Sequence, residues 1–356
     1  MPDPAEPSDA NPRDRRGYGV FDALLDLLGL PMVLLTITGF LGDWHWLIDL
    51  TAPFRLQYAI GLALVALLVA WRRQWVRVAV LLAAVAVNAW LVASLSLPPA
   101  HGPASGSASR ATDPPLRLVV ANVSTRNPRK SDALHAIAGP KADVVLLMEV
   151  SPAWFEVIPR HLPGYDTVMA HAQWDNFGMA LMVADHSPWT CEGTTAWMPP
   201  NQLPAADAVL THPDGERWRL LGLHPVPPMS ARRAASRRET LATAAAWARN
   251  RPDEPKLLAG DLNATPWCVP FRELQADTGL VNSMRGHGLA PSWPSLDGLP
   301  YALNAAGMIP IDHVLHSPSI RTTTRSTFRI PGSDHRGVVV ELQRLPSGTD
   351  TQSPAR

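Results

Sequence analysis

The sequence predicts an α/β domain with a sheet core, preceded by three transmembrane helices. Residues 21–97 hold three long apolar runs, whereas from residue 116 onwards short apolar runs alternate with helix-like segments. A stretch rich in Pro, Ala, Ser and Gly, residues 97–115, separates the two regions. Alternating strands and helices are typical of a layered α/β domain.

The three apolar runs, residues 21–41, 56–71 and 78–97, are each long enough, with their flanks, to cross a bilayer. They could instead be buried helices of a soluble domain, but most of their length carries no charge, and only Asn88 interrupts the third. A cleaved signal peptide would explain one run and leave two unexplained. We therefore expect a disordered cytoplasmic tail (1–18), a three-span membrane anchor (19–97), a linker (98–115), a catalytic domain (116–345) and a second disordered tail (346–356).

Arginine is distributed unevenly around these runs. The tail carries Arg13, Arg15 and Arg16, and the loop between the second and third runs carries Arg72, Arg73 and Arg77. The loop between the first and second runs has two aspartates and one arginine. Because positive loops stay in the cytoplasm, three spans place residues 116–345 outside it, on a multi-pass protein of the cell (inner) membrane.

Within the second region, the apolar runs predict strands at residues 116–121, 143–148, 179–184, 218–223, 257–259, 311–316 and 337–343. Helices are expected at residues 131–137, 232–249 and 271–277. Polar residues follow or precede several of these strands: Asn122, Glu149, His224, Asp261, Asn263, Asp312, Asp334 and His335. Each could be an ordinary turn or a solvated strand end, but together they suggest one site at the edge of a sheet.

The residue types suit metal-assisted hydrolysis of a phosphoester. Glu149 is a hard oxygen ligand for an ion such as Mg²⁺, and Asp261 can orient the attacking water. His335 can act as a general base or stabilise charge, with Asp312 fixing its tautomer. The side chains of His224, Asn122 and Asn263 can donate to phosphoryl oxygens.

These stretches resemble the endonuclease/exonuclease/phosphatase superfamily, which includes pancreatic-type deoxyribonuclease. The matching segments occur in the family's order: VVANV at 119–123, LLMEV at 146–150, LGLHP at 221–225, LLAGDLNATP at 257–266, IDHVL at 311–315 and SDHRGV at 333–338. The resemblance implies a four-layer α/β/β/α sandwich, two mixed sheets flanked by helices. It also implies Mg²⁺ or Mn²⁺ near Asn122, Glu149 and Asp334, with catalytic roles for the five residues His224, Asp261, Asn263, Asp312 and His335.

Two departures refine this resemblance. His224 stands where apurinic endonucleases carry tyrosine, and Ser124 stands where nucleases often place an acid. With three preceding spans, the HPVPP stretch at 224–228 resembles bacterial membrane-anchored members, among them glycopeptide-resistance-associated proteins with suggested lipid-diphosphate phosphatase activity. We therefore expect a membrane-anchored phosphohydrolase whose substrate is a phosphoester or diphosphate, with a lipid phosphate as one candidate.

Two alternatives stay open: an extracytoplasmic metal-dependent nuclease, and a non-catalytic envelope binding protein on the same fold. The chain has 31 basic and 31 acidic residues, so no global positive field favours nucleic acid. The one basic run of the second region, RRAASRR at 232–238, is either a solvated helix face or a phosphate-binding patch. Trp267 and Trp293 either line the site or pack in turns. Cys191 and Cys268 are expected to be unpaired thiols, unless an oxidising compartment lets them pair.

Overall fold

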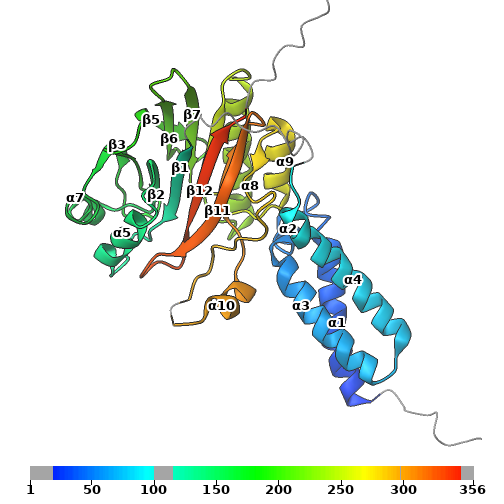
Figure 1. Ribbon diagram of the computed structural model, residues 1–356. Helices are drawn as coiled ribbons and strands as arrows, with labels where there is room; N and C mark the ends of the chain where they lie inside the picture. Colours follow the sequence, from blue (N-terminus) through cyan, green and yellow to red (C-terminus); the bar gives the residue numbers. More distant parts are fainter. Residues whose placement is uncertain (1–18, 100–114, 297, 346–356) are drawn as a thin grey trace, which may run out of the picture.

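The computed structural model describes residues 19–99, 115–296 and 298–345. The predicted tails, 1–18 and 346–356, and most of the predicted linker, 98–115, lie outside the described residues. The described chain forms a helical bundle at the N-terminus and a larger domain of two sheets, from which the bundle projects (Figure 1).

The helical bundle consists of α1 (Val20–Thr38), α3 (Arg55–Trp71) and α4 (Trp75–Ala93), with the short α2 (Trp46–Asp49), η2 (Ala52–Phe54) and η3 (Ser94–Ser96) at the end near the sheets. Three helical segments, Val20–Thr38, Trp46–Trp71 and Trp75–Ser96, are long and apolar enough to cross a membrane, as predicted. Leu62 and Val69 pack inside the bundle, whereas large apolar side chains such as Leu67 cover its outside. Such a surface suits lipid better than water.

Polar groups inside the bundle have partners. The Arg55 guanidinium donates to the Thr36 carbonyl at 2.8 Å and to Asn88 Oδ1 at 3.4 Å, which accounts for the asparagine in the third apolar run. At the other end of the bundle, Arg72 pairs with Asp22 at 2.9 Å. This ion pair brings the start of α1 next to the α3–α4 loop, at the end away from the sheets.

The larger domain contains two six-stranded sheets. The first has the order β11-β12-β1-β2-β4-β3: β11 (Ile320–Arg329), β12 (Arg336–Arg344), β1 (Leu116–Asn122), β2 (Val144–Met148), β4 (Met179–Ala184) and β3 (Tyr165–His171). The second has the order β5-β6-β7-β8-β10-β9: β5 (Thr190–Met198), β6 (Leu203–Thr211), β7 (Arg217–Leu223), β8 (Lys256–Asp261), β10 (Asp312–His316) and β9 (Val281–Asn282). Both sheets are mixed, because β1 with β2 and β7 with β8 are parallel pairs among antiparallel ones.

Side-chain alternation along the central strands builds the layers. In β1, Leu118 and Val120 face the second sheet, where Leu220 and Leu257 meet them. Val119 and Ala121 face the opposite way and pack under the helices α5 (Lys130–Ala138), α6 (Pro152–Phe155) and α7 (Ile158–His161).

The second sheet has the same arrangement. Its outer face, including Leu221 and Leu258, is covered by α8 (Ala231–Arg249) and α9 (Val269–Thr278), while the short α10 (Tyr301–Gly307) contacts α3 of the bundle. The predicted four-layer α/β/β/α sandwich is therefore confirmed.

The bundle packs directly on the domain through an apolar cluster. Ala52 and Leu95 of the bundle meet Trp267 and Met284, so Trp267 packs at this junction. Gln57 Nε2 donates to the carbonyls of Ala306 and Met308, both at 3.0 Å.

The two cysteines are not bonded to each other. Cys191 packs against the core between the sheets, whereas Cys268 is buried under α9 in the outer cluster of the second sheet. Both thiols are therefore unpaired in this structure, as expected.

Candidate active site

The predicted site residues come from the centres of both sheets. Asn122 ends β1, Glu149 follows β2, His224 follows β7, Asp261 ends β8 and Asp312 begins β10. Because β1–β2 and β7–β8 are parallel pairs, their carboxyl ends lie at the same edge of each sheet. Face-to-face packing then brings the two edges together around one cleft.

An amide joins the acids of the two sheets. Asn122 Nδ2 donates to Glu149 Oε1 at 3.0 Å and to Asp261 Oδ2 at 3.2 Å. The Thr125 N–H donates to Glu149 Oε2 at 3.2 Å, and Glu149 itself has φ 62°. That left-handed conformation is uncommon for a residue with a side chain, so this backbone is held in place by its surroundings. Asn122 thus lies beside Glu149 with its amide nitrogen, not its oxygen, towards the carboxylate.

Two histidines face the same oxygen of Asp261. His224 Nε2 lies 3.4 Å and His335 Nε2 lies 3.7 Å from Asp261 Oδ2. Asp312 Oδ2 accepts from His335 Nδ1 at 2.9 Å, which is the predicted acid–histidine pair. All four side chains are buried, so these interactions are little screened by solvent.

Burial and charge act in opposite directions on these groups. Burial lowers the pKa of His335, but the carboxylates of Asp312 and Asp261 prevail and raise it to about 10. Burial raises the pKa of Asp261, but His335 and His224 lower it to about 2. The cluster therefore favours a charged pair, an ionised Asp261 beside a protonated imidazole.

One group of three side chains among the described residues could hold a cation, and Glu149 offers a separate carboxylate. One ligand atom from each of Asp261, Asp312 and His335 lies within 4.8 Å of the others, which is close enough for a shared ion. The Asp312–His335 hydrogen bond already engages two of these three side chains, so we favour Glu149 as the carboxylate that would bind the ion. Glu149 forms no ion pair within the described residues, and its oxygens meet only N–H donors.

The loop after β8 is shaped by Gly260 and Asn263. Gly260 has φ 143°, and a Cβ placed there would lie 1.9 Å from the Leu223 carbonyl oxygen, so only glycine fits. The Asn263 N–H donates to Asp261 Oδ1 at 2.9 Å, and its Nδ2 donates to the Pro225 carbonyl at 3.0 Å. This second bond uses one of the two amide hydrogens and leaves the other for a substrate oxygen.

A cavity of about 710 Å³ is lined by Glu149, His224, Asp261, Asn263 and His335, whereas Asn122 and Asp312 are not among its lining residues. Asp334 lines it as an exposed carboxylate that accepts from Trp293 Nε1 at 2.9 Å, and Phe177 packs against His224 with ring centroids 5.3 Å apart. Four residues of the helical bundle line the same cavity: Trp46, Leu50, Pro53 and Phe54.

The sequence did not identify the part that the bundle plays in this cleft. No local pattern marks Trp46 or Phe54, because only tertiary packing brings them to the site. The two roles that the sequence left open for the RRAASRR run each apply to part of it. Arg233 and Arg237 line the cavity, whereas Arg238 pairs with Glu273 on the exposed side of the helix. Trp293 lines the cavity, which is the first of the two roles that the sequence left open for it.

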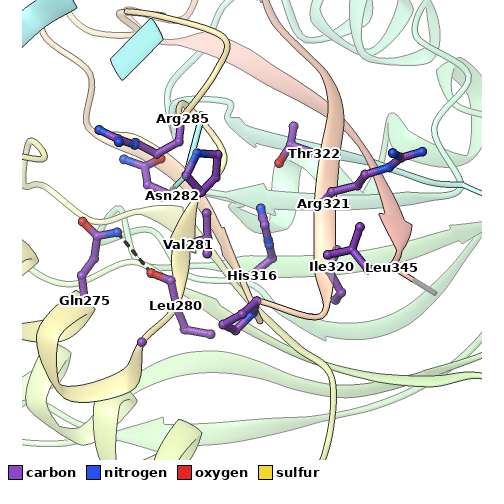
Figure 2. Close-up of a pocket in the computed structure, with 13 residues that line it drawn as sticks. Gln275, Leu280, Val281, Asn282, Arg285, His316, Ile320, Arg321, Thr322 and Leu345 are labelled. Carbon is purple, nitrogen blue, oxygen red and sulfur yellow. Dashed lines mark hydrogen bonds between the residues drawn. The ribbon is translucent and has the colours of Figure 1, made fainter. Parts of the chain in front are cut away.

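A second cavity, of about 470 Å³, lies between β9 and β11 and holds none of the predicted site residues (Figure 2). Arg285, Arg321 and His316 line it, and Gln275 Nε2 donates to the Leu280 carbonyl at its edge. Its lining contains no carboxylate, so it lacks the anionic oxygen ligands by which proteins usually bind Mg²⁺.

Comparison with known proteins agrees with this geometry. The sequence profile of the Endonuclease/Exonuclease/phosphatase family matches residues 119–335, whereas no curated protein matches the sequence significantly. A solved endonuclease/exonuclease/phosphatase structure from Bacteroides vulgatus has a TM-score of 0.53 at 16% identity, covering 65% of this chain and 99% of that one.

Two other solved structures share the fold. The human Nocturnin catalytic domain with bound sulfate has a TM-score of 0.51 at 16% identity, covering 65% of this chain and 96% of its own. D. rerio TDP2 complexed with a single-strand DNA product also reaches 0.51 at 16% identity, covering 65% and 99%. The profile match spans more than half of the sequence, from the middle of β1 to His335. The chain therefore belongs to the endonuclease/exonuclease/phosphatase family, whose members hydrolyse phosphoester bonds.

Proposed function

We propose that this chain is a membrane-anchored, divalent-metal-dependent phosphohydrolase that cleaves phosphoesters or diphosphates outside the cytoplasm. One observation carries the proposal: the acids, amides and imidazoles of both sheets line a single cleft, and the helical bundle forms part of its wall.

The donor set fits a hard divalent cation such as Mg²⁺ or Mn²⁺. Glu149 is an oxygen ligand held by two N–H donors, one of them the amide of Asn122, and Asp334 adds a second carboxylate to the cleft. Bound there, the ion would neutralise charge on the phosphoryl oxygens and leave most of its coordination sphere to water and substrate.

The remaining residues act on the nucleophile and the phosphate. Asp312 holds His335 by Nδ1, which turns Nε2 towards Asp261. Asp261 can accept a hydrogen bond from the attacking water and orient it for in-line attack. His224, beside the same Asp261 oxygen, and Asn263, beside the other, can donate to phosphoryl oxygens as negative charge develops.

A lipid phosphate or diphosphate is the substrate that the cleft favours. Trp46, Leu50 and Phe54 give it an apolar side, and Met229 and Ile309 extend this apolar surface. A phosphate headgroup could lie at the polar floor while its hydrocarbon contacts these side chains, three of which belong to a helical segment suited to a bilayer, Trp46–Trp71.

The arrangement of the bundle supports an extracytoplasmic site. The arginine-rich α3–α4 loop lies at the end of the bundle away from the sheets, next to the start of α1. Since arginine-rich loops stay in the cytoplasm, the sheets would lie on the other side. Reporter fusions at the C-terminus test this: alkaline phosphatase should be active and a fluorescent protein dark, and the reverse pattern would place the site in the cytoplasm.

Substrate assays of the purified full-length protein with Mg²⁺ separate the functions. We expect phosphate release from phosphatidic acid or a prenyl diphosphate, loss of release with EDTA, and loss in Glu149→Gln. Glu192→Gln, on the exposed side of β5, is the matched control and should retain activity. Plasmid nicking without phosphate release would favour the nuclease, and failure to bind Mg²⁺ or Mn²⁺ would favour a non-catalytic binding protein.

A further inference from the structure

A buried ion pair ties the helical bundle to the catalytic domain. Arg237 of α8 contacts Asp49, the last residue of α2, with Nη2 and Oδ2 2.9 Å apart. Their side chains are only 3% and 6% exposed. The other Asp49 oxygen accepts from the Val269 N–H at 2.7 Å, so both oxygens have a partner in the catalytic domain. Because buried charges are tolerated only with such partners, this pair fixes α2 on the domain.

The same arginine reaches the catalytic loop. Arg237 Nη1 donates to the backbone carbonyl of Asn263, whose own N–H donates to Asp261 Oδ1. Asn263 has φ 49°, a left-handed conformation that a residue other than glycine keeps only when its surroundings hold it. A continuous series of polar contacts therefore runs from Asp49 through Arg237 and Asn263 to Asp261.

We propose that Asp49 and Arg237 are positioning residues, through which the helical bundle holds the Asp261–Asn263 loop in its catalytic geometry. The bundle would then be part of the catalytic apparatus and not only a tether. This inference goes beyond the proposed function, because the order of the loop can be measured without any substrate.

A neighbouring ion pair at the same junction provides a control. Arg238, the next residue of α8, lies 3.6 Å from Asp43 of the bundle, and both side chains are about half exposed. Arg238 also pairs with Glu273, and within the part of the chain that the structure describes it makes no hydrogen bond or ion pair with the catalytic loop. Loss of Asp43 therefore removes a bundle–domain ion pair without touching the loop.

Hydrogen–deuterium exchange of the full-length protein in detergent tests the proposal. In Asp49→Asn and Arg237→Lys, the backbone amides of residues 260–266 should exchange about tenfold faster, because loss of the Asp49–Arg237–Asn263 contacts lets the loop open locally. Lysine keeps the positive charge but lacks the planar fork that reaches two oxygens in different directions. Asp43→Asn should leave exchange in this segment at the wild-type rate. Wild-type exchange in both Asp49→Asn and Arg237→Lys would overturn the proposal.

A charge swap separates positioning from docking. Asp49→Arg combined with Arg237→Asp restores an ion pair between bundle and domain, but an aspartate cannot donate to the Asn263 carbonyl. We expect fast exchange to persist, and kcat for p-nitrophenyl phosphate to stay about tenfold or more below wild type with little change in KM. Recovery of both wild-type exchange and kcat in the swap would show that the pair only docks the bundle. Absence of turnover in the wild type would count against the proposed function and leave the exchange result as the test of positioning.

Discussion

Asp312 is the side chain whose substitution separates chemistry from metal binding. Its carboxylate accepts a hydrogen bond from His335 Nδ1 at 2.9 Å, whereas Asn122 bonds Glu149 and Asp261. Asp312→Asn keeps the shape of the side chain but removes a carboxylate that raises the pKa of His335 and orients its imidazole. We expect kcat to fall by about 10²–10⁴-fold while metal affinity stays unchanged.

Steady-state kinetics and metal titration of the same preparation check this prediction. Asp166→Asn, an exposed aspartate on β3, is the matched control and should behave as the wild type. Wild-type kcat in Asp312→Asn would remove the acid–histidine pair from the mechanism.

His316 makes the domain sensitive to acid. It lies in β10, and burial lowers its pKa to about 4, so the folded state keeps it neutral where the unfolded chain binds a proton. Stability is therefore complete above the unfolded pKa of about 6.5 and falls as pH drops towards 4, by up to about 3 kcal/mol.

Thermal melts between pH 7 and pH 4 measure this loss. His316→Gln should reduce the pH dependence without abolishing it, because burial also lowers the pKa of His313, to about 3, and its contribution has the same sign. The substitution itself lowers stability at neutral pH. The exposed His186→Gln is the control and should keep the wild-type slope. An unchanged slope in His316→Gln would mean that other groups cause the acid sensitivity.

At the scale of elements, the strand–loop unit around Gly260 positions Asp261. A methyl group at Gly260 would meet the Leu223 carbonyl oxygen at 1.9 Å, and φ is 143°. Gly260→Ala should therefore cost about 3 kcal/mol or more, because β7 and β8 must separate. Gly279→Ala, also at positive φ but in open space, should cost only about 1 kcal/mol in the same chemical denaturation assay. Equal losses would mean that close packing against Leu223 does not set the need for glycine.

The elements also explain which parts of the fold could be predicted. Central strands such as β2 and β8 are buried throughout and stand out as apolar runs. Five strands were missed: β3, β5, β6, β9 and β11. Three of them, β3, β5 and β11, lie at sheet edges with mostly exposed or half-buried residues, β6 is rich in small alanines, and β9 has only two residues. An exposed strand gains its order from pairing with distant residues, which a local sequence window does not contain.

Several residues of the candidate site could be predicted because they border the buried central strands. Asn122, Glu149 and Asp261 each stand next to an apolar run, so their place at a sheet edge follows from sequence. The contributions of Asp49, Trp46 and Arg237 depend on how the bundle packs against the domain. Arg237 belongs to a basic run that resembles a solvated helix face, and only the structure reveals that it is buried.

At the scale of the whole molecule, the cleft lies where a helical bundle suited to a membrane meets a phosphoesterase fold. Shortening the apolar wall with Phe54→Ala should raise KM for phosphatidic acid in mixed micelles about tenfold and leave p-nitrophenyl phosphate turnover unchanged. Leu67→Ala, an exposed apolar change on the outside of the bundle, is the control. Equal KM for phosphatidic acid in Phe54→Ala and wild type would mean that hydrocarbon does not bind at this wall.

Metal-dependent turnover by the full-length protein tests the central claim most directly. Phosphate release should require Mg²⁺ or Mn²⁺, stop with EDTA, return on adding metal, and be lost in a folded Glu149→Gln that binds metal more weakly. Release that continues in EDTA, or in Glu149→Gln at the wild-type rate, would contradict the assignment of this cleft as a metal-dependent phosphohydrolase site.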